Sequence, residues 1–265
     1  MENAQVRYSV TGHIAHLVLN NPERFNAIGP RMATDLVDTL RAAAANRQVR
    51  AVLLSGAGKA FCAGGDLEFF ELGLADGDLD MAGLVRAMGQ VALSIRTMPK
   101  PVIASVHRVA AGAGLGLALL SDFCIASADT TFSTAFIRLG LTPDTGVGFV
   151  LGRTLGPARA SDLLMSGRTI TAAEAKAWGL ITEVVPATDL GRATMDLVDG
   201  LVAGPVDAFA GIKEQLFGTV FSGFEEHLAR EAGQQAARAS STDLVEGLRA
   251  FRERRAPDFL PPPSS

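Results

Sequence analysis

The sequence predicts an α/β core followed by an α-helical C-terminal region. Strand-like and helix-like segments alternate up to about residue 190, and from Leu190 onward only helical patterns occur. The chain has 265 residues, of which 48% are hydrophobic, so one large domain with a sizeable core is expected. We expect a core over 1–190, a helical region over 191–256 and a disordered tail over 257–265.

Apolar periodicity and turn residues give the individual elements. Pro30 begins a helix with one apolar face, and Met98-Pro99-Lys100-Pro101 ends a later one. Thr171 and Glu174 have the spacing of a capping box. The expected strands cover 8–20, 49–54, 101–106, 124–126 and 131–132; the expected helices cover 81–97, a stretch ending near 120, a stretch from 143 to 166, and then 205–216, 224–239 and 242–255.

Composition excludes several classes of function. The net charge is −4 and aromatic residues make up 6%, so nucleic-acid binding is not expected. Cys62 and Cys124 have no CxxC spacing and predict buried free thiols in a reducing compartment. No histidine pair has metal-ligand spacing, and neither a signal peptide nor a membrane-spanning run is evident. A cytoplasmic protein without metal is the expectation.

Two glycine-rich segments follow predicted strands. The first, SGAGKAFCAGGDL over 55–67, comes after the strand at 49–54, and the second, AAGAGLGLALL over 110–120, comes after the strand at 101–106. Glycine lets backbone amides approach a ligand closely, and a helix N-terminus adds unpaired amides. If the two turns meet, one amide from each could form a two-donor site for a carbonyl oxygen. Close packing of small residues is the alternative explanation.

Asp144 is the carboxylate that stands out. It follows Pro143 and lies between the apolar stretches 136–141 and 147–151. It could be the N-cap of the following helix, since aspartate is among the best capping residues. It could also be a partly desolvated carboxylate whose raised pKa suits a base.

The chain resembles the enoyl-CoA hydratase/isomerase (crotonase) superfamily from about Val10 to Phe259. The resemblance rests on five motifs in order: NNPERFNAI, GKAFCAGGDL, AAGAGLGLALLSDFCIA, FSTAFIRLGLTPDTG and LLMSGRTITAAEAKAWGLITEVV. It implies a spiral of ββα units with C-terminal helices, assembled as trimers or dimers of trimers. It also implies an acyl-CoA thioester as substrate, with coenzyme A as part of that substrate and no further cofactor.

The resemblance also implies roles for individual residues. The two amides that hold an enolate oxygen would be those of Gly65 and Ala113, with Gly114 as the neighbouring alternative. The FRERRAPDF segment resembles the terminal helix that reaches a neighbour's coenzyme A site, with Phe251 and Arg254 as candidates. The other residues matched to substrate or coenzyme A contacts are Arg24, Ala27, Ala63, Gly64, Asp66, Leu67 and Phe136.

Departures from the family pattern point to the chemistry. Enoyl-CoA hydratases carry two glutamates, and this chain has Gly116 and Phe136 at those positions. Asp144 instead matches the catalytic aspartate of the 1,2-epoxyphenylacetyl-CoA isomerase branch. The resemblance therefore favours an isomerase of fatty-acid or phenylacetate metabolism, which shifts a 3-enoyl double bond to position 2 or isomerises a ring acyl-CoA. The alternatives are a hydratase (a lyase), a non-catalytic acyl-CoA binding protein, and an aryl-CoA dehalogenase with Asp144 as nucleophile.

Overall fold

The core of the molecule is a six-stranded sheet with a smaller sheet beside it. The structure is a computed structural model, and it describes residues 4–260. The large sheet has the order β1-β2-β3-β4-β6-β9, in which only β1 runs antiparallel to its neighbour. Its strands are β1 (Val6–Thr11), β2 (Ile14–Leu19), β3 (Ala51–Gly56), β4 (Val102–Val106), β6 (Phe123–Ser127) and β9 (Glu183–Val185).

The chain winds between the two sheets as a spiral. The small sheet consists of β5 (Val109–Ala111), β7 (Thr131–Ser133) and β8 (Thr169–Thr171). The chain passes from β4 to β5 and then through α4 (Ala113–Leu120) to β6 and β7, so each of these two turns adds one strand to each sheet before a helix follows. This is the ββα spiral that the resemblance implied, and the expected fold class is confirmed.

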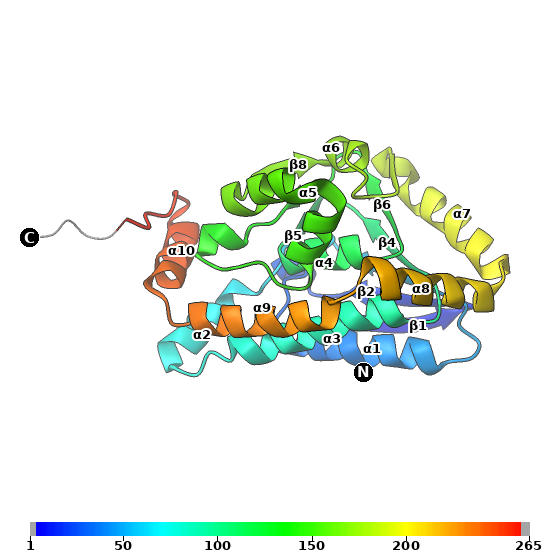
Figure 1. Ribbon diagram of the computed structural model, residues 1–265, viewed down its shortest axis with the longest axis horizontal. Helices are drawn as coiled ribbons and strands as arrows, with labels where there is room; N and C mark the ends of the chain where they lie inside the picture. Colours follow the sequence, from blue (N-terminus) through cyan, green and yellow to red (C-terminus); the bar gives the residue numbers. More distant parts are fainter. Residues whose placement is uncertain (1–3, 261–265) are drawn as a thin grey trace, which may run out of the picture.

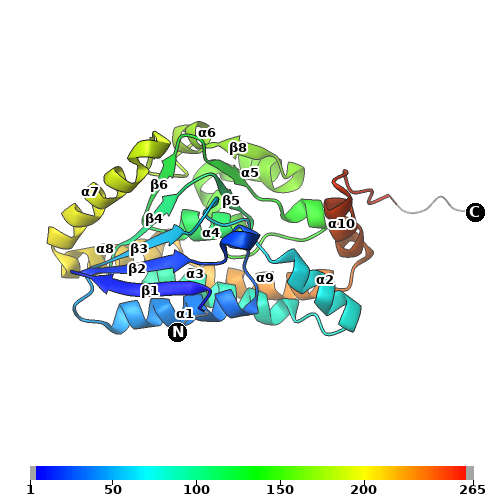
Figure 2. The ribbon, with the colours of Figure 1, turned by 180° about the vertical axis from the view of Figure 1, so that it is seen from behind.

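Helices cover both faces of the large sheet (Figure 1). On one face α1 (Pro30–Ala45) and α3 (Met81–Thr97) pack against each other, and Figure 2 shows α1 beside the first strands. On the other face α7 (Leu190–Ala203) buries Val198 against Leu53 and Ile103. The remaining helices are α2 (Leu67–Asp76), α5 (Val147–Ser166), α6 (Ala172–Ala177), α8 (Val206–Val220), α9 (Phe224–Arg238) and α10 (Thr242–Glu253), with 3-10 turns η1 (Pro22–Arg24), η2 (Phe136–Leu139) and η3 (Ala187–Asp189).

The C-terminal helices lie against the core rather than apart from it. α9 packs along α3, and α10 packs on η2 at the end of the molecule where α2 also lies (Figure 1). In the expected tail 257–265, the amide of Asp258 donates a hydrogen bond of 2.8 Å to Glu246, and residues 261–265 lie outside the described part of the chain.

Some expected elements need correction. The single strand expected over 8–20 is two antiparallel strands, because Gly12 turns the chain with a φ of +58°. The expected elements also omitted α2, α7 and the three-residue strands β5, β8 and β9. A strand of three residues is too short to show a period. The capping box is confirmed: the Thr171 hydroxyl accepts from the Glu174 amide while the Glu174 carboxylate accepts from the Thr171 amide.

Candidate active site

The two glycine turns meet at the ends of the neighbouring strands β3 and β4. Cys62 and Ala110 pair as a parallel bridge, with hydrogen bonds of 3.0 Å from Cys62 N to Val109 O and from Ala111 N to Cys62 O. A Cβ on Gly64 would lie 3.0 Å from the carbonyl oxygen of Ala111. Only glycine at position 64, with its φ of +101°, lets the turns approach so closely.

Two backbone amides are free at this junction. Gly64 O accepts from Ile28 N and Asp66 N donates to Ile28 O, so the intervening amide of Gly65 faces the other way along this extended segment. Ala113 is the first residue of α4, where helical amides have no partner within the helix. Neither amide donates a hydrogen bond to a described residue, and both residues line the same cavity. This arrangement can bind one carbonyl oxygen between two donors.

Gly114 and Gly116 of α4 pack against other segments of the chain and do not line the cavity. A Cβ on Gly114 would lie 2.6 Å from the carbonyl oxygen of Cys62, and Gly114 does not line the cavity. Ala113 is therefore the better candidate for the second amide. A Cβ on Gly116 would lie 2.8 Å from the Thr145 side chain. The first of the two glutamate positions thus has no room for a carboxylate.

Asp144 does not cap α5. The helix begins at Val147, and no side chain caps its first turn. The carboxylate instead accepts hydrogen bonds from the Thr145 hydroxyl, at 2.7 Å, and from the amide nitrogen of Gln235, at 3.0 Å. Burial raises the pKa of Asp144 to about 7; the hydrogen bond from Thr145 opposes this, and the negative charge of Glu231 adds to it. The capping interpretation is wrong, and the desolvated carboxylate is what the structure has.

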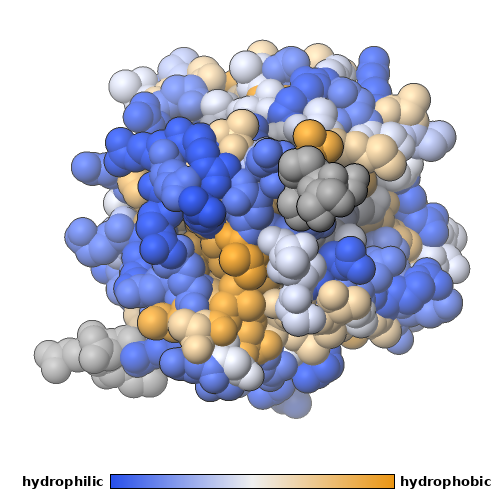
Figure 3. All heavy atoms as spheres, turned by 90° about the vertical axis from the view of Figure 1, so that its left-hand side faces the viewer, coloured by the Kyte–Doolittle hydropathy of each residue, from blue (hydrophilic) through white to orange (hydrophobic). Residues whose placement is uncertain are grey.

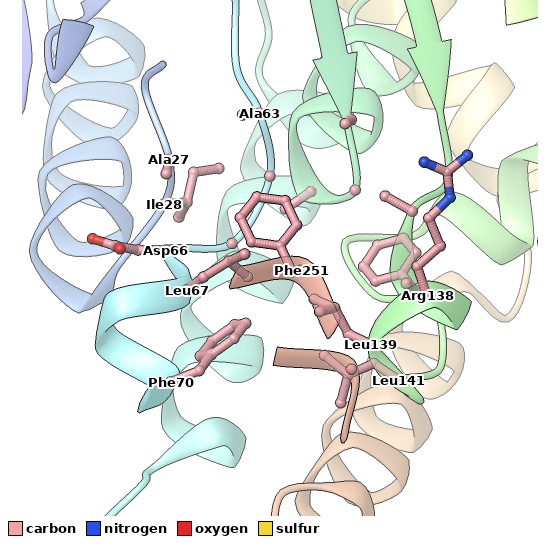
Figure 4. Close-up of a pocket in the computed structure, with 18 of the residues that line it drawn as sticks. Ala27, Ile28, Ala63, Asp66, Leu67, Phe70, Arg138, Leu139, Leu141 and Phe251 are labelled. Carbon is pink, nitrogen blue, oxygen red and sulfur yellow. The ribbon is translucent and has the colours of Figure 1, made fainter. Parts of the chain in front are cut away.

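A cavity of about 1140 Å³ connects these groups. Gly65, Ala113, Phe136 and Asp144 all line it. Much of its remaining wall is apolar, and Figure 3 shows an apolar strip running into the surface on the side that carries α10. In Figure 4, Phe251, Leu139 and Leu141 lie across from Leu67 and Phe70. The further apolar wall comes from α3 and consists of Met81, Leu84, Val85 and Met88.

Comparisons with known proteins agree with this geometry. The family model described as enoyl-CoA hydratase/isomerase matches residues 10–261. The chain belongs to the enoyl-CoA hydratase/isomerase family. Members of this family are enzymes that act on acyl-CoA thioesters.

Relatives in this family have both isomerase and hydratase names. A trans-2-decenoyl-[acyl-carrier-protein] isomerase of Streptococcus mutans is 32% identical, over 98% of this chain and 99% of that protein. The 1,2-epoxyphenylacetyl-CoA isomerase of Escherichia coli is 34% identical, over 92% and 93%, which agrees with the branch named above. A crystal structure of an enoyl-CoA hydratase from Mycobacterium avium subsp. paratuberculosis has a TM-score of 0.89 at 29% identity, covering 97% and 99% of the two chains.

The residues matched to family coenzyme A contacts cluster at the cavity mouth. Ala27, Ala63, Gly64 and Leu67 line the cavity. Asp66 accepts from the Glu68 amide as the N-cap of α2, and its carboxylate pairs with Arg24 at 3.2 Å. Arg24 also pairs with Glu68. The charge of Arg24 is thus partly neutralised before any ligand binds.

The C-terminal segment of the family pattern lies over the cavity of its own chain. Phe251 and Arg254 both line that cavity, and Phe251 is 66% exposed. Arg252 ties α10 to α2 through Glu71, at 3.0 Å. Within the chain itself, this segment forms one side of the cavity, and its expected reach to a neighbour's site stays a prediction.

Sequence reasoning missed the polar groups that surround Asp144. Thr145, Glu231 and Gln235 are buried, and the last two belong to α9. A signal was present, since Glu231 and Gln235 fall on the same helical face as the apolar Leu228 and Ala232. Polar residues on a buried face need partners, and such residues can indicate a site.

Among residues 4–260, no three His, Cys, Asp or Glu side chains are grouped so that they could hold a metal ion. Between residues 4 and 260, no helix is both long enough and apolar enough to cross a membrane. Cys62 and Cys124 are buried free thiols, as expected, and burial raises the pKa of each to about 12.

Proposed function

We propose that the protein is an enoyl-CoA isomerase that moves a double bond from position 3 to position 2, or isomerises a ring acyl-CoA, through a thioester enolate. One observation carries the proposal. Asp144, whose pKa is raised to about 7, lines the same cavity as the two free amides of Gly65 and Ala113. A base and a two-donor oxyanion site are the two parts that enolate formation needs.

In the first step the substrate carbonyl lies between the amides of Gly65 and Ala113. Asp144 removes a proton from C2, the C2–H electron pair forms the C1–C2 double bond of a dienolate, and negative charge moves to the thioester oxygen. The two amides stabilise that charge more strongly than they stabilise the neutral carbonyl, which lowers the barrier. Loss of one such donor typically costs about 3 to 4 kcal/mol of barrier.

In the second step Asp144 returns the proton at C4. The dienolate electrons form the C2–C3 double bond, the carbonyl is restored, and the carboxylate is regenerated. One group can be base and then acid because a pKa of about 7 leaves both forms populated at neutral pH. Phe136 lines the cavity and excludes water from the reacting carbons. The steps need no cofactor besides the coenzyme A of the substrate.

The residues at the two glutamate positions support an isomerase over a hydratase. Addition of water by the two-glutamate route needs a carboxylate at both places. Gly116 has its side-chain space taken by Thr145, and Phe136 is apolar. A single carboxylate suits proton transfer between two carbons of one substrate.

We further propose that the chain assembles as a homotrimer or a dimer of trimers. Ile212, Leu216 and Val220 are exposed apolar residues spaced four apart on α8. An exposed apolar stripe of this kind is typical of a subunit interface. Light scattering of the purified protein should give three or six chain masses, and a monomer would contradict the proposal.

The test of the isomerase is an assay on two substrates. Wild-type protein should convert a 3-enoyl-CoA to the conjugated 2-enoyl-CoA, followed by absorbance, faster than it hydrates a 2-enoyl-CoA. Asp144→Asn should lose at least about a hundredfold in this rate, the usual contribution of a general base. Asp199→Asn, a matched change at an exposed aspartate of α7, should leave it unchanged. Hydration that survives in Asp144→Asn would contradict the proposal, and binding without turnover would indicate an acyl-CoA binding protein.

A further inference from the structure

Three polar residues of α9 face the loop that carries Asp144. His227, Glu231 and Gln235 are spaced four apart and so lie along one side of the helix. Gln235 is fully buried and Glu231 is 3% exposed. None of the three lines the cavity, so their positions do not allow them to touch a bound substrate.

Gln235 fixes the orientation of the Asp144 carboxylate. Its side-chain nitrogen donates to Thr142 O at 2.6 Å and to one carboxylate oxygen of Asp144 at 3.0 Å. The other carboxylate oxygen accepts from Thr145 at 2.7 Å. A reversed amide would set the Gln235 oxygen against two acceptors, so only one orientation of this amide is compatible with the loop. Each Asp144 oxygen keeps a lone pair for the substrate proton.

Glu231 holds the other end of the same loop and adds a second buried negative charge. One of its oxygens accepts from Gly146 N at 3.1 Å, and the other lies 3.0 Å from His227 Nε2. Two neighbouring carboxylates cannot both ionise without a cost, so the negative charge of Glu231 favours the protonated form of Asp144.

Few other charges act on this pair. Among the described residues, His227 is the one basic side chain within 4 Å of the Glu231 carboxylate. On the helices packed against α9, Arg96 of α3 is paired with Asp122 and Arg86 of α3 with Asp80. Arg153 of α5 donates to Ser222 O and lies over the Phe149 ring.

We propose that Gln235 and Glu231 are positioning residues for the reaction of Asp144: Gln235 orients the carboxylate, and the charge of Glu231, held by His227 and Gly146, sets how readily Asp144 takes up and releases its proton. The inference rests on the proposed function for its consequence in catalysis. The hydrogen bonds that link Asp144 with Gln235, and Glu231 with His227, do not depend on the proposed function. Their effect on Asp144 can be tested without substrate.

The first test is a carbon-13 NMR titration of the aspartate carboxyls in the substrate-free protein, in which the Asp144 signal is the one missing in Asp144→Asn. Glu231→Gln removes the neighbouring charge and keeps an acceptor for Gly146 N, so the Asp144 midpoint should fall by about one pH unit. Gln235→Met removes the donor to the carboxylate at similar size, so the midpoint should rise. Glu226→Gln, an exposed residue of the same helix that pairs with Arg230, should not move it.

The Asp144 midpoint should therefore shift in opposite directions in Glu231→Gln and Gln235→Met. If these residues only packed against the loop, the two variants would not give opposite shifts. No shift in Glu231→Gln, or shifts of the same sign in both variants, would overturn the proposal. On 3-enoyl-CoA, Gln235→Met should lower kcat by about tenfold with KM little changed, and Glu231→Gln should move the acidic limb of the pH–rate profile with the NMR midpoint. Because the titration needs no substrate, it decides the inference even if Asp144→Asn retains activity and the proposed function fails.

Discussion

Asp144 should make the protein less stable as the pH rises towards neutrality. The folded state holds its proton up to a pKa of about 7, whereas an unfolded aspartate releases it near 3.9. Between those values the folded state binds more protons than the unfolded state, so stability falls with rising pH, and the loss is complete above about pH 7. Asparagine at 144 removes this dependence while it can still accept from Gln235 and donate to Thr145.

We therefore expect Asp144→Asn to be more stable than wild type at pH 8 and similar to it at pH 4. The difference between the folded and unfolded pKa values of Asp144 corresponds to roughly 4 kcal/mol of unfolding free energy at most, since one pKa unit is about 1.4 kcal/mol. Urea unfolding at the two pH values measures the difference. A variant that is less stable than wild type at pH 8 would show that the carboxylate is not held in the raised state.

Gly116 can be tested as a packing position. A Cβ there would lie 2.8 Å from both the side chain and the carbonyl oxygen of Thr145, so Gly116→Ala should destabilise by about 1 to 3 kcal/mol. Gly152, an exposed glycine of α5 with no atom within 4 Å of an added Cβ, is the matched control. Gly152→Ala should stabilise by up to about 1 kcal/mol through helix propensity. Equal effects in thermal unfolding would contradict the close contact.

Residue by residue, the sequence indicated Asp144 and both glycine turns, because each is a local signal. It could not show that Thr145 fills the space beside Gly116 or that Gln235 holds Asp144 from 91 positions away. Such contacts depend on how helices pack across the fold. The choice between base and helix cap was open for the same reason, since only the three-dimensional partners of Asp144 decide it.

At the scale of elements, one carboxylate, whose side chain is 12% exposed, joins three of them. Asp122, just before β6, accepts from Arg96 of α3 at 3.0 Å and from Lys213 of α8 at 2.6 Å. It also accepts from the amide of Val102 in β4. Burial lowers the pKa of Lys213 to about 8, and the nearby Asp122 opposes this. Removal of the carboxylate would leave two cations buried together.

Asp122→Asn should therefore destabilise by about 3 to 5 kcal/mol, the usual effect of breaking a buried ion pair. Glu226→Gln, which breaks the exposed pair with Arg230, should change stability by less than about 1 kcal/mol. Denaturant unfolding compares the two. If the loss in Asp122→Asn were as small as in the exposed control, this cluster would not join the elements as described.

Most of the long helices could be predicted from periodicity, with the 14-residue α7 as an exception, and three of the shortest strands could not. α1, α3, α9 and α10 each have more than ten residues, enough for a helical stripe to be evident. β5, β8 and β9 have three residues each and are defined by their partners in the sheets. The hairpin of β1 and β2 was missed because one glycine turn interrupts a continuous apolar alternation.

For the whole molecule, the alternation of strand-like and helix-like segments predicts an α/β core. It does not determine how the chain passes between the two sheets. The spiral came from the family resemblance, and the strand orders confirm it. The same path explains the site: it sets β3 and β4 side by side, so the two glycine turns end at one place and α9 returns behind Asp144.

The most direct measurement is proton NMR of a 3-enoyl-CoA in D₂O with wild-type protein and with Asp144→Asn. It observes the removal of the C2 proton and its replacement at C4, the two events assigned to one carboxylate. We predict that wild type transfers the C2 hydrogen to C4 with little deuterium entering at C4, because Asp144 returns the proton that it removed. Asp144→Asn should be at least about a hundredfold slower in this conversion, while it still binds acyl-CoA. Loss of the C2 proton that continues at the wild-type rate in Asp144→Asn would contradict the account, because another group would then remove the proton.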